Sequence, residues 1–251
     1  MCIMTMAATL TNGVRALFFA LGCMITSTVI YTLVTDGTPF RKELLTPWMA
    51  ATLVDFYINV LAIGAWVLYK EPRWISALLW LVLLVCLGSI ATCAYIFFQL
   101  LRLSPQEATE DPIYHVLHRS TTKDAAEQKT CSVIIARCVF GVLSFVMLGT
   151  LVYTIVTDGS PFRRELLTPW LSATLIDFYV NIIALAVWVA YKESSWITAS
   201  LWIVLLICFG SLSTCVYIVV QLFHLSPQDP VHLVLFNSSN RAGNGYKTFE
   251  R

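Results

Sequence analysis

The sequence predicts an all-α polytopic membrane helix bundle, with six transmembrane helices arranged as two inverted three-helix repeats. The prediction rests on an apolar composition, on six long apolar segments, and on a tandem duplication that places three of those segments in each copy. Of 251 residues, 58% are hydrophobic and 12% are charged, and the mean hydropathy is +0.74. Soluble domains contain about 25% charged residues, so the composition favours an integral, multi-pass membrane protein.

Charge and motifs narrow the functional classes. The net charge of +1 comes without a basic patch, so we expect no nucleic-acid partner. Most of the eight cysteines lie within apolar segments and none forms a Cys-x-x-Cys pair, which favours packing over disulfide or metal chemistry. No nucleotide-binding, zinc-protease or serine-hydrolase motif occurs. We therefore expect no metal and no cofactor, and an enzyme is not the favoured class.

The duplication is visible when the chain is compared with itself. A shift of 122 residues aligns 31–106 with 153–228 without a gap, and 49 of the 76 aligned positions are identical. The most similar stretches are "TDGTPFRKELLTPW" and "TDGSPFRRELLTPW". Because so much of one copy recurs in the other, we expect both copies to have the same local structure.

Each copy contains three segments long enough to cross a bilayer. They are 14–34, 47–69 and 74–101 in the first copy, and 134–156, 169–191 and 196–223 in the second. At 1.5 Å per residue, each reaches the ~30 Å of a hydrocarbon core. Thr46-Pro47 and Thr168-Pro169 supply a capping residue followed by proline at the first helical position.

The segments divide the chain into five parts. These are an N-terminal segment (1–13), the first three-helix repeat (14–102), a polar connector with a short interfacial helix (103–133), the second three-helix repeat (134–224) and a C-terminal tail (225–251). The connector is too rich in charge to cross the membrane, so three crossings per copy would turn the second copy upside down. In that arrangement eight Lys and Arg residues lie on each side, and the positive-inside rule gives no orientation.

A polar stripe interrupts the second segment of each copy. Asp55 and Asn59 lie one helical turn apart near the middle of 47–69, and Asp177 and Asn181 repeat them in 169–191. A charged side chain at mid-bilayer costs about 2.5–3.5 kcal/mol on the insertion scale. These aspartates should therefore face the bundle interior.

We expect small polar residues of the third segments to lie at the same depth as the aspartates. We expect no Lys or Arg at that depth. Carboxylates without a cationic partner favour a proton or a small cation. We predict a substrate- or ion-binding group of eight residues: Asp55, Asn59, Asp177, Asn181, Ser89, Thr92, Ser211 and Thr214.

Two functions remain open on this evidence. One is a small-solute or ion transporter, proton-coupled in one form, that uses the pair of mid-membrane aspartates. The other is a non-transporting membrane scaffold or assembly factor in which the Asp and Asn side chains hold helices together. The expected partners are the lipid bilayer and, for a transporter, a small solute or proton. A homo-oligomer is compatible with the sequence.

The loops between the first and second segments carry a second candidate group. Either they form a pair of gates on opposite faces, or they are turns closed by surface ion pairs. The residues are Asp36, Arg41, Glu43, Asp158, Arg163 and Glu165.

The duplicated motif TDG[ST]PFR[RK]ELLTPW, followed by ATL[VI]DFY[IV]N, resembles that of a plant family of membrane proteins of about this length. The family is catalogued as a domain of unknown function (number 1475). The resemblance covers nearly the whole chain and implies a multi-pass membrane protein of plant type. It transfers no activity, so the predicted sites rest on the residues alone.

Overall fold

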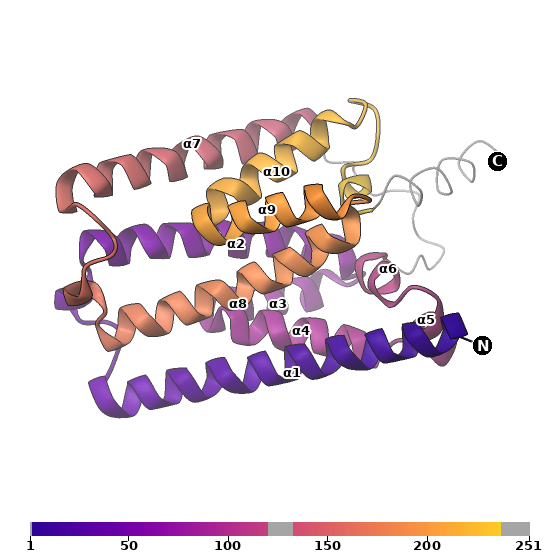
Figure 1. Ribbon diagram of the computed structural model, residues 1–251, viewed down its shortest axis with the longest axis horizontal. Helices are drawn as coiled ribbons and strands as arrows, with labels where there is room; N and C mark the ends of the chain where they lie inside the picture. The colour runs from indigo at the N-terminus through magenta and orange to yellow at the C-terminus, as the bar shows by residue number, and fades with distance from the viewer. Residues whose placement is uncertain (1, 120–132, 237–251) are drawn as a thin grey trace.

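The computed structural model describes residues 2–119 and 133–236, with side chains from Thr9 onward, and every regular element in these ranges is a helix (Figure 1). The rest of the predicted connector and tail, 120–132 and 237–251, lies outside the described residues. The first half contains α1 (Cys2–Asp36), η1 (Lys42–Leu44), α2 (Pro47–Lys70), α3 (Trp74–Leu87), α4 (Ser89–Leu101), α5 (Pro105–Glu110) and α6 (Pro112–Leu117). The second contains α7 (Val133–Asp158), η3 (Arg164–Leu166), α8 (Pro169–Lys192), α9 (Trp196–Phe209), α10 (Ser211–Phe223) and η4 (Val231–Leu235).

Four of the described helices, α1, α2, α7 and α8, are long and apolar enough to span a membrane. The 24 residues of α2 extend about 36 Å. Its first turn is capped by Thr46, whose Oγ1 accepts the main-chain N–H of Met49 at 3.2 Å. Thr168 accepts the N–H of Leu171 in the same way at the start of α8. The threonine–proline pairs therefore begin these helices, as the sequence predicts.

The third apolar segment of each half is not a continuous helix, and the structure does not confirm the prediction of six spans. Gly88 separates α3 from α4 and Gly210 separates α9 from α10, with φ of +56° and +55°. The rings of Trp80 and Tyr95 are 4.9 Å apart, although fifteen residues of continuous helix would extend about 22 Å. The rings of Trp202 and Tyr217 are 5.0 Å apart in the second half. Each segment is therefore a helical hairpin.

A glutamate closes the base of each hairpin. Glu71, just before α3, accepts hydrogen bonds from the Tyr95 hydroxyl at 3.0 Å and from Gln99 Nε2 at 3.1 Å, both on the returning helix. Glu193 accepts the corresponding bonds in the second half, at 2.7 and 3.0 Å. The two helices of a hairpin have 14 and 13 residues, so each extends only about 20 Å. Because the second helix runs back along the first, each hairpin begins and ends at the same end of the bundle.

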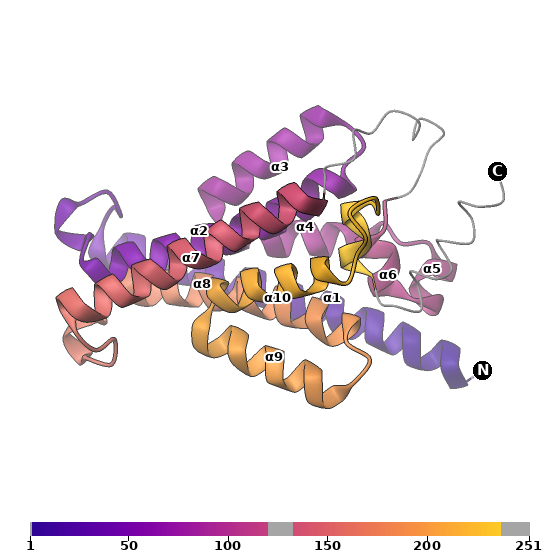
Figure 2. The ribbon, with the colours of Figure 1, turned by 90° about the horizontal axis from the view of Figure 1, so that it is seen from above.

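The two halves consequently run parallel, so the structure does not confirm the predicted inversion either. Two membrane-length helices and a returning hairpin bring the chain back to the end where it started, and the second half repeats the direction of the first. The loops that follow α1 and α7 lie at the same end, where Trp170 Nε1 donates to the Gly37 carbonyl at 3.2 Å. Figures 1 and 2 show these loops on the left and the N-terminus on the right, and Figure 2 shows α3 and α9 on opposite sides of the bundle.

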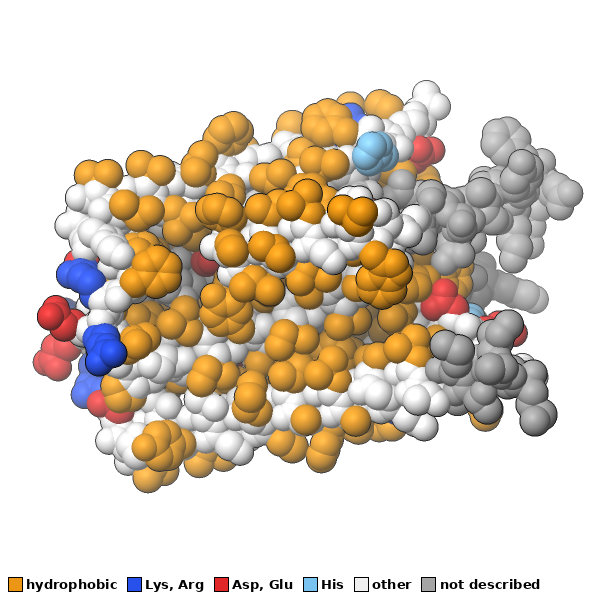
Figure 3. All heavy atoms as spheres, viewed as in Figure 1, with side chains coloured by type: hydrophobic (Ala, Val, Ile, Leu, Met, Phe, Trp, Pro, Cys, Tyr) orange, Lys and Arg blue, Asp and Glu red, His pale blue; other side chains and the backbone are white. Residues whose placement is uncertain are grey.

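The core lies between the halves, where α2 packs against α8. Every third or fourth residue of these helices is buried, as expected for one face of a helix. The main residues are Phe56, Val60, Ile63 and Val67 from α2, with Phe178, Ile182, Leu185 and Val189 from α8. Exposed hydrophobic side chains cover much of the outer flank, and charged side chains gather at the loop end (Figure 3).

In the inverted arrangement predicted from the sequence, Lys and Arg residues are divided equally between the two sides. The parallel arrangement divides them unequally. Within the described residues, four Lys and Arg lie at the loop end and seven at the end that holds the N-terminus and the hairpin bases. The four are Arg41, Lys42, Arg163 and Arg164, and the seven are Arg15, Lys70, Arg73, Arg102, Arg119, Arg137 and Lys192. The positive-inside rule favours a cytosolic location for the end with seven.

Sided labelling tests this topology. In a chain whose eight cysteines are replaced, Thr38→Cys and Ser160→Cys are each expected to react with a membrane-impermeant maleimide added to intact cells. Gln106→Cys, at the opposite end, should react only after permeabilisation. Modification of Thr38→Cys and Ser160→Cys from opposite sides would instead support six inverted spans.

The hairpin tips require glycine. A Cβ at Gly88 would lie 2.5 Å from Asp177 Oδ2 and 2.7 Å from Phe56 Cζ, on a backbone conformation that side chains rarely adopt. We expect Gly88→Ala to lower the free energy of unfolding by about 1–3 kcal/mol. Gly149→Ala in α7 is the control, since nothing lies within 4 Å of its Cβ position and alanine is the better helix former. Equal midpoints for the two variants in thermal unfolding would contradict the assigned tip geometry.

Candidate functional site

Each aspartate of the predicted group caps the hairpin of the opposite half. Asp55 Oδ1, on α2, accepts the main-chain N–H of Ser211 at 2.6 Å. Asp177 Oδ1, on α8, accepts the N–H of Ser89 at 2.8 Å. Ser211 and Ser89 are the first residues of α10 and α4, where main-chain N–H groups have no partner within the helix. A carboxylate at this position also interacts favourably with the helix dipole.

The eight predicted residues form two polar clusters, each built from both halves. The first cluster comprises Asp55 and Asn59 from α2 with Ser211 and Thr214 from α10. The second cluster comprises Asp177 and Asn181 from α8 with Ser89 and Thr92 from α4; its direct contact is the bond from Ser89 to Asp177. Sequence reasoning placed all eight at one depth, and the structure pairs each aspartate with the other half's hairpin.

Both clusters are deeply buried. The Asn and Ser side chains of both are 0% exposed and the two threonines are 1% exposed, whereas the aspartates are half-buried. Burial of polar groups is costly unless they are hydrogen-bonded. The pairing of their polar atoms therefore indicates whether the clusters are complete without a ligand.

The two clusters differ in that pairing. In the first cluster, Thr214 Oγ1 donates to Asn59 Oδ1 at 2.8 Å, which leaves Asn59 Nδ2 and Ser211 Oγ without a protein partner in the described chain. In the second, no described protein atom pairs with either amide atom of Asn181 or with the hydroxyls of Ser89 and Thr92. More than about 90% of buried polar groups in proteins have partners, so the second cluster is equipped to hold a small polar species.

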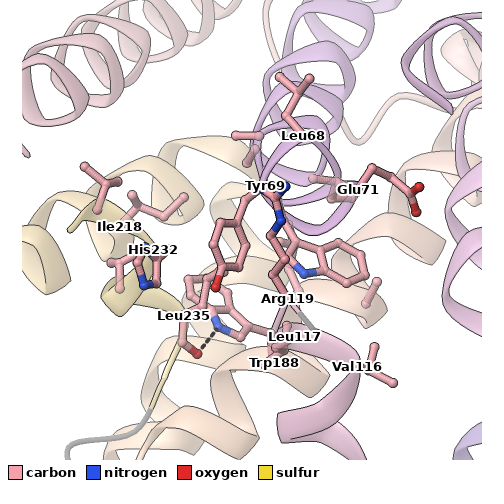
Figure 4. A pocket seen from close by; sticks show the side chains of 18 of the residues that line it. Leu68, Tyr69, Glu71, Val116, Leu117, Arg119, Trp188, Ile218, His232 and Leu235 are labelled. Carbon is pink, nitrogen blue, oxygen red and sulfur yellow. Dashed lines mark hydrogen bonds between the residues drawn. The ribbon is translucent and has the colours of Figure 1, made fainter. Parts of the chain in front are cut away.

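A cavity of about 1330 Å³ lies between the halves, toward the end with the hairpin bases (Figure 4). The membrane-length helices α1, α2, α7 and α8 all line it. The rest of the wall comes from α3, α4, α6, α10 and the segment around η4. Of the eight predicted residues it touches Thr92 and neither aspartate. The cavity thus extends to the edge of the second cluster, one helical turn from Ser89.

The ligand atoms available in the second cluster are oxygens. Asp177 supplies one carboxylate, and Asn181, Ser89 and Thr92 supply neutral oxygens. No group of three or more His, Cys, Asp or Glu side chains suited to a metal occurs in the described residues. One carboxylate with neutral oxygens matches the charge of a proton or another monovalent cation.

The loop residues predicted as gates form ion pairs at the surface. Arg41 pairs with Asp36 at 2.7 Å and Arg163 with Asp158 at 2.6 Å, all partly exposed. Glu43 and Glu165 lie in η1 and η3 and are exposed. The expectation that the two loops lie on opposite faces is wrong, because both are at one end. Exposed pairs of this kind contribute about 0–1 kcal/mol.

Sequence reasoning missed the hairpins and the glutamates that close them. One signal was present: the 28 residues from 74 to 101 exceed the ~20 that a spanning helix needs, and Gly88 interrupts them. Glu71 was missed because it lies just outside the apolar segment.

Comparison with known families agrees with the motif. Residues 5–242 match the family described as "Protein of unknown function (DUF1475)". The chain belongs to this family. No curated protein and no solved structure gives a significant match. The DUF1475 match spans both halves, including both clusters and both hairpins, and its description assigns no activity.

The different pairing of the two asparagines can be tested by substitution. In buffer without added alkali cations, we expect Asn181→Leu to be more stable than Asn59→Leu. The first change removes two buried amide atoms that have no partner. Each buried, unpaired atom of this kind lowers the stability of the folded state by about 1–3 kcal/mol. The second also breaks the hydrogen bond from Thr214. Equal unfolding midpoints, or a lower one for Asn181→Leu, would show that Asn181 is engaged as strongly as Asn59.

Proposed function

We propose that this membrane protein is a small-solute or ion transporter whose mid-membrane aspartates bind a proton or another monovalent cation at the hairpin tips. The observation that supports the proposal best is the group of buried, unpartnered polar atoms around Asp177. Ionisable residues within membranes commonly mark ion and proton pathways. Interrupted helices supply the binding sites of many transporters.

A monovalent cation suits the charge of the site. A single carboxylate and one monovalent cation have a net charge of zero. A neutral site is the least costly to bury in a medium of low dielectric constant. No Lys or Arg hydrogen bond or ion pair reaches either aspartate in the described chain. A bound cation would therefore supply the counter-charge that the protein itself does not.

Binding would act on the hairpin through the cap. The Asp177 carboxylate accepts the Ser89 N–H as a charge-assisted hydrogen bond, a type roughly twice as strong as a neutral one. A proton or cation on the carboxylate weakens that bond and loosens the tip of the α3–α4 hairpin. The cavity that reaches Thr92 gives access from the end with the hairpin bases. Ion binding and hairpin position are linked in this way.

The scaffold interpretation is favoured by a different observation, the caps themselves. Both aspartates have a main-chain partner without any ligand, and neither lines the cavity. In this interpretation the clusters only join the two halves, as interhelical polar groups do in many membrane proteins.

Flux measurements separate the two functions. In proteoliposomes we expect proton or sodium uptake by the wild type, and uptake at the level of empty liposomes for Asp177→Asn. The amide can still accept the Ser89 N–H but carries no charge to match a cation. Asp36→Asn, which alters a surface ion pair, is the matched control and should retain uptake.

Thermal unfolding provides a readout that does not depend on finding the substrate. A cation at about one hundred times its dissociation constant stabilises a protein by ~2.7 kcal/mol, so sodium or a lower pH should raise the midpoint of the wild type. Asn181→Leu should abolish that rise while remaining folded. Absence of flux and of any cation-dependent stabilisation in the wild type would reject transport and favour the scaffold.

A further inference from the structure

The cavity between the halves has the size and lining of a lipid site. Its volume of about 1330 Å³ exceeds the ~300–1,000 Å³ typical of small-molecule pockets. Aliphatic and aromatic side chains form most of the wall, and α2 contributes more of them than any other helix. A ligand that fills this wall must be largely hydrocarbon.

The lining includes apolar side chains that are partly exposed on the outside of the bundle. Leu61 and Leu68 of α2 are 46% and 51% exposed, and Ile135 and Val139 of α7 are 56% and 43% exposed. All four lie within helices long enough to span the membrane. A ligand can therefore enter sideways from the bilayer.

The titratable side chains of the lining gather in one region. Figure 4 shows Tyr69, Arg119 and His232 around the cavity near the ends of α2 and α6. The rings of Tyr69 and His232 stack at 4.9 Å, and burial lowers the pKa of His232. Glu71 also lines the cavity, but its carboxylate accepts bonds from Ser76, Tyr95 and Gln99. Arg119 thus provides the positive charge.

One buried donor in the wall has no protein acceptor. Trp188 Nε1 donates to the Leu235 carbonyl at 3.2 Å, the dashed line in Figure 4. Its counterpart Trp66 Nε1 lines the same cavity and is buried without a partner in the described chain. Indole and guanidinium groups donate hydrogen bonds and cannot accept them, so the ligand's polar group must be rich in acceptors.

We propose that this cavity binds an anionic amphiphile from the bilayer, with its hydrocarbon along α2, α7, α8 and α10 and its acidic head at Arg119 and Trp66. A carboxylate and a phosphate monoester both meet this description. The inference concerns binding and is independent of the transport proposal.

Native mass spectrometry of the full chain tests the proposal. The purified protein is mixed in detergent with oleate, dioleoyl phosphatidate or dioleoyl phosphatidylcholine at equal mole fractions. We expect one molecule of an anionic lipid to be retained at least about tenfold more tightly than phosphatidylcholine, the order of effect of one charge-assisted contact. Preference for oleate or for phosphatidate identifies the head as a carboxylate or a phosphate. Equal retention of all three lipids overturns the proposal.

Variants locate the bound lipid. Arg119→Gln should remove the preference for anionic lipid, and Ala65→Trp, which adds bulk to the wall of α2, should reduce binding of the anionic lipids. Arg102→Gln is the matched control because it removes a positive charge at the same end, outside the lining. Retention by a folded Ala65→Trp equal to that of the wild type places the lipid elsewhere and overturns the proposal.

A wild-type measurement covers the case in which these variants fail to fold. Phosphatidate with brominated chains should quench tryptophan fluorescence more than brominated phosphatidylcholine at equal mole fraction, since Trp66 and Trp188 line the cavity. Equal quenching by the two lipids also overturns the proposal.

Discussion

The contact between a carboxylate of a long apolar helix and the tip of a hairpin is the interaction on which the rest of the structure depends. Asp55 caps α10 and Asp177 caps α4, so each half holds the reversing backbone of the other. Backbone that leaves the helical pattern at membrane depth is tolerated only where protein or water satisfies it. The crossed caps meet that condition, and they bring Asp177 so close to Gly88 that a side chain there would collide with it.

The same caps create the candidate site. A carboxylate that reaches the first N–H of α4 also draws Asn181, Ser89 and Thr92 into the protein interior, where four of their polar atoms have no described protein partner. In the first cluster the bond from Thr214 to Asn59 reduces that number to two. Two nearly identical sets of residues therefore differ in how completely they are paired. The less complete set is the one that the cavity touches at Thr92.

The hairpins also shape the cavity. A helix of 13 or 14 residues that turns back at a glycine does not fill the length of the bundle as a spanning helix would. The bonds from Tyr95 and Gln99 to Glu71 hold the hairpin closed at its base, next to the polar region of the lining. The reversal at Gly88 therefore accounts for three features of the cavity. These are its apolar wall, its exposed apolar border and the hydrogen-bond donors at one end.

Composition, apolar segment length and local signals determined the all-α class and the capped starts at Thr46 and Thr168. Each of these depends on neighbours within a turn or two of helix. The reversals at Gly88 and Gly210 depend on contacts between residues far apart in sequence, such as Asp177 with Ser89. An apolar segment looks the same whether it crosses or returns, so six inverted spans were predicted where the structure has four membrane-length helices and two hairpins. Only the tertiary structure decided the direction of the second half and the partner of each aspartate, since both follow from where the chain turns back.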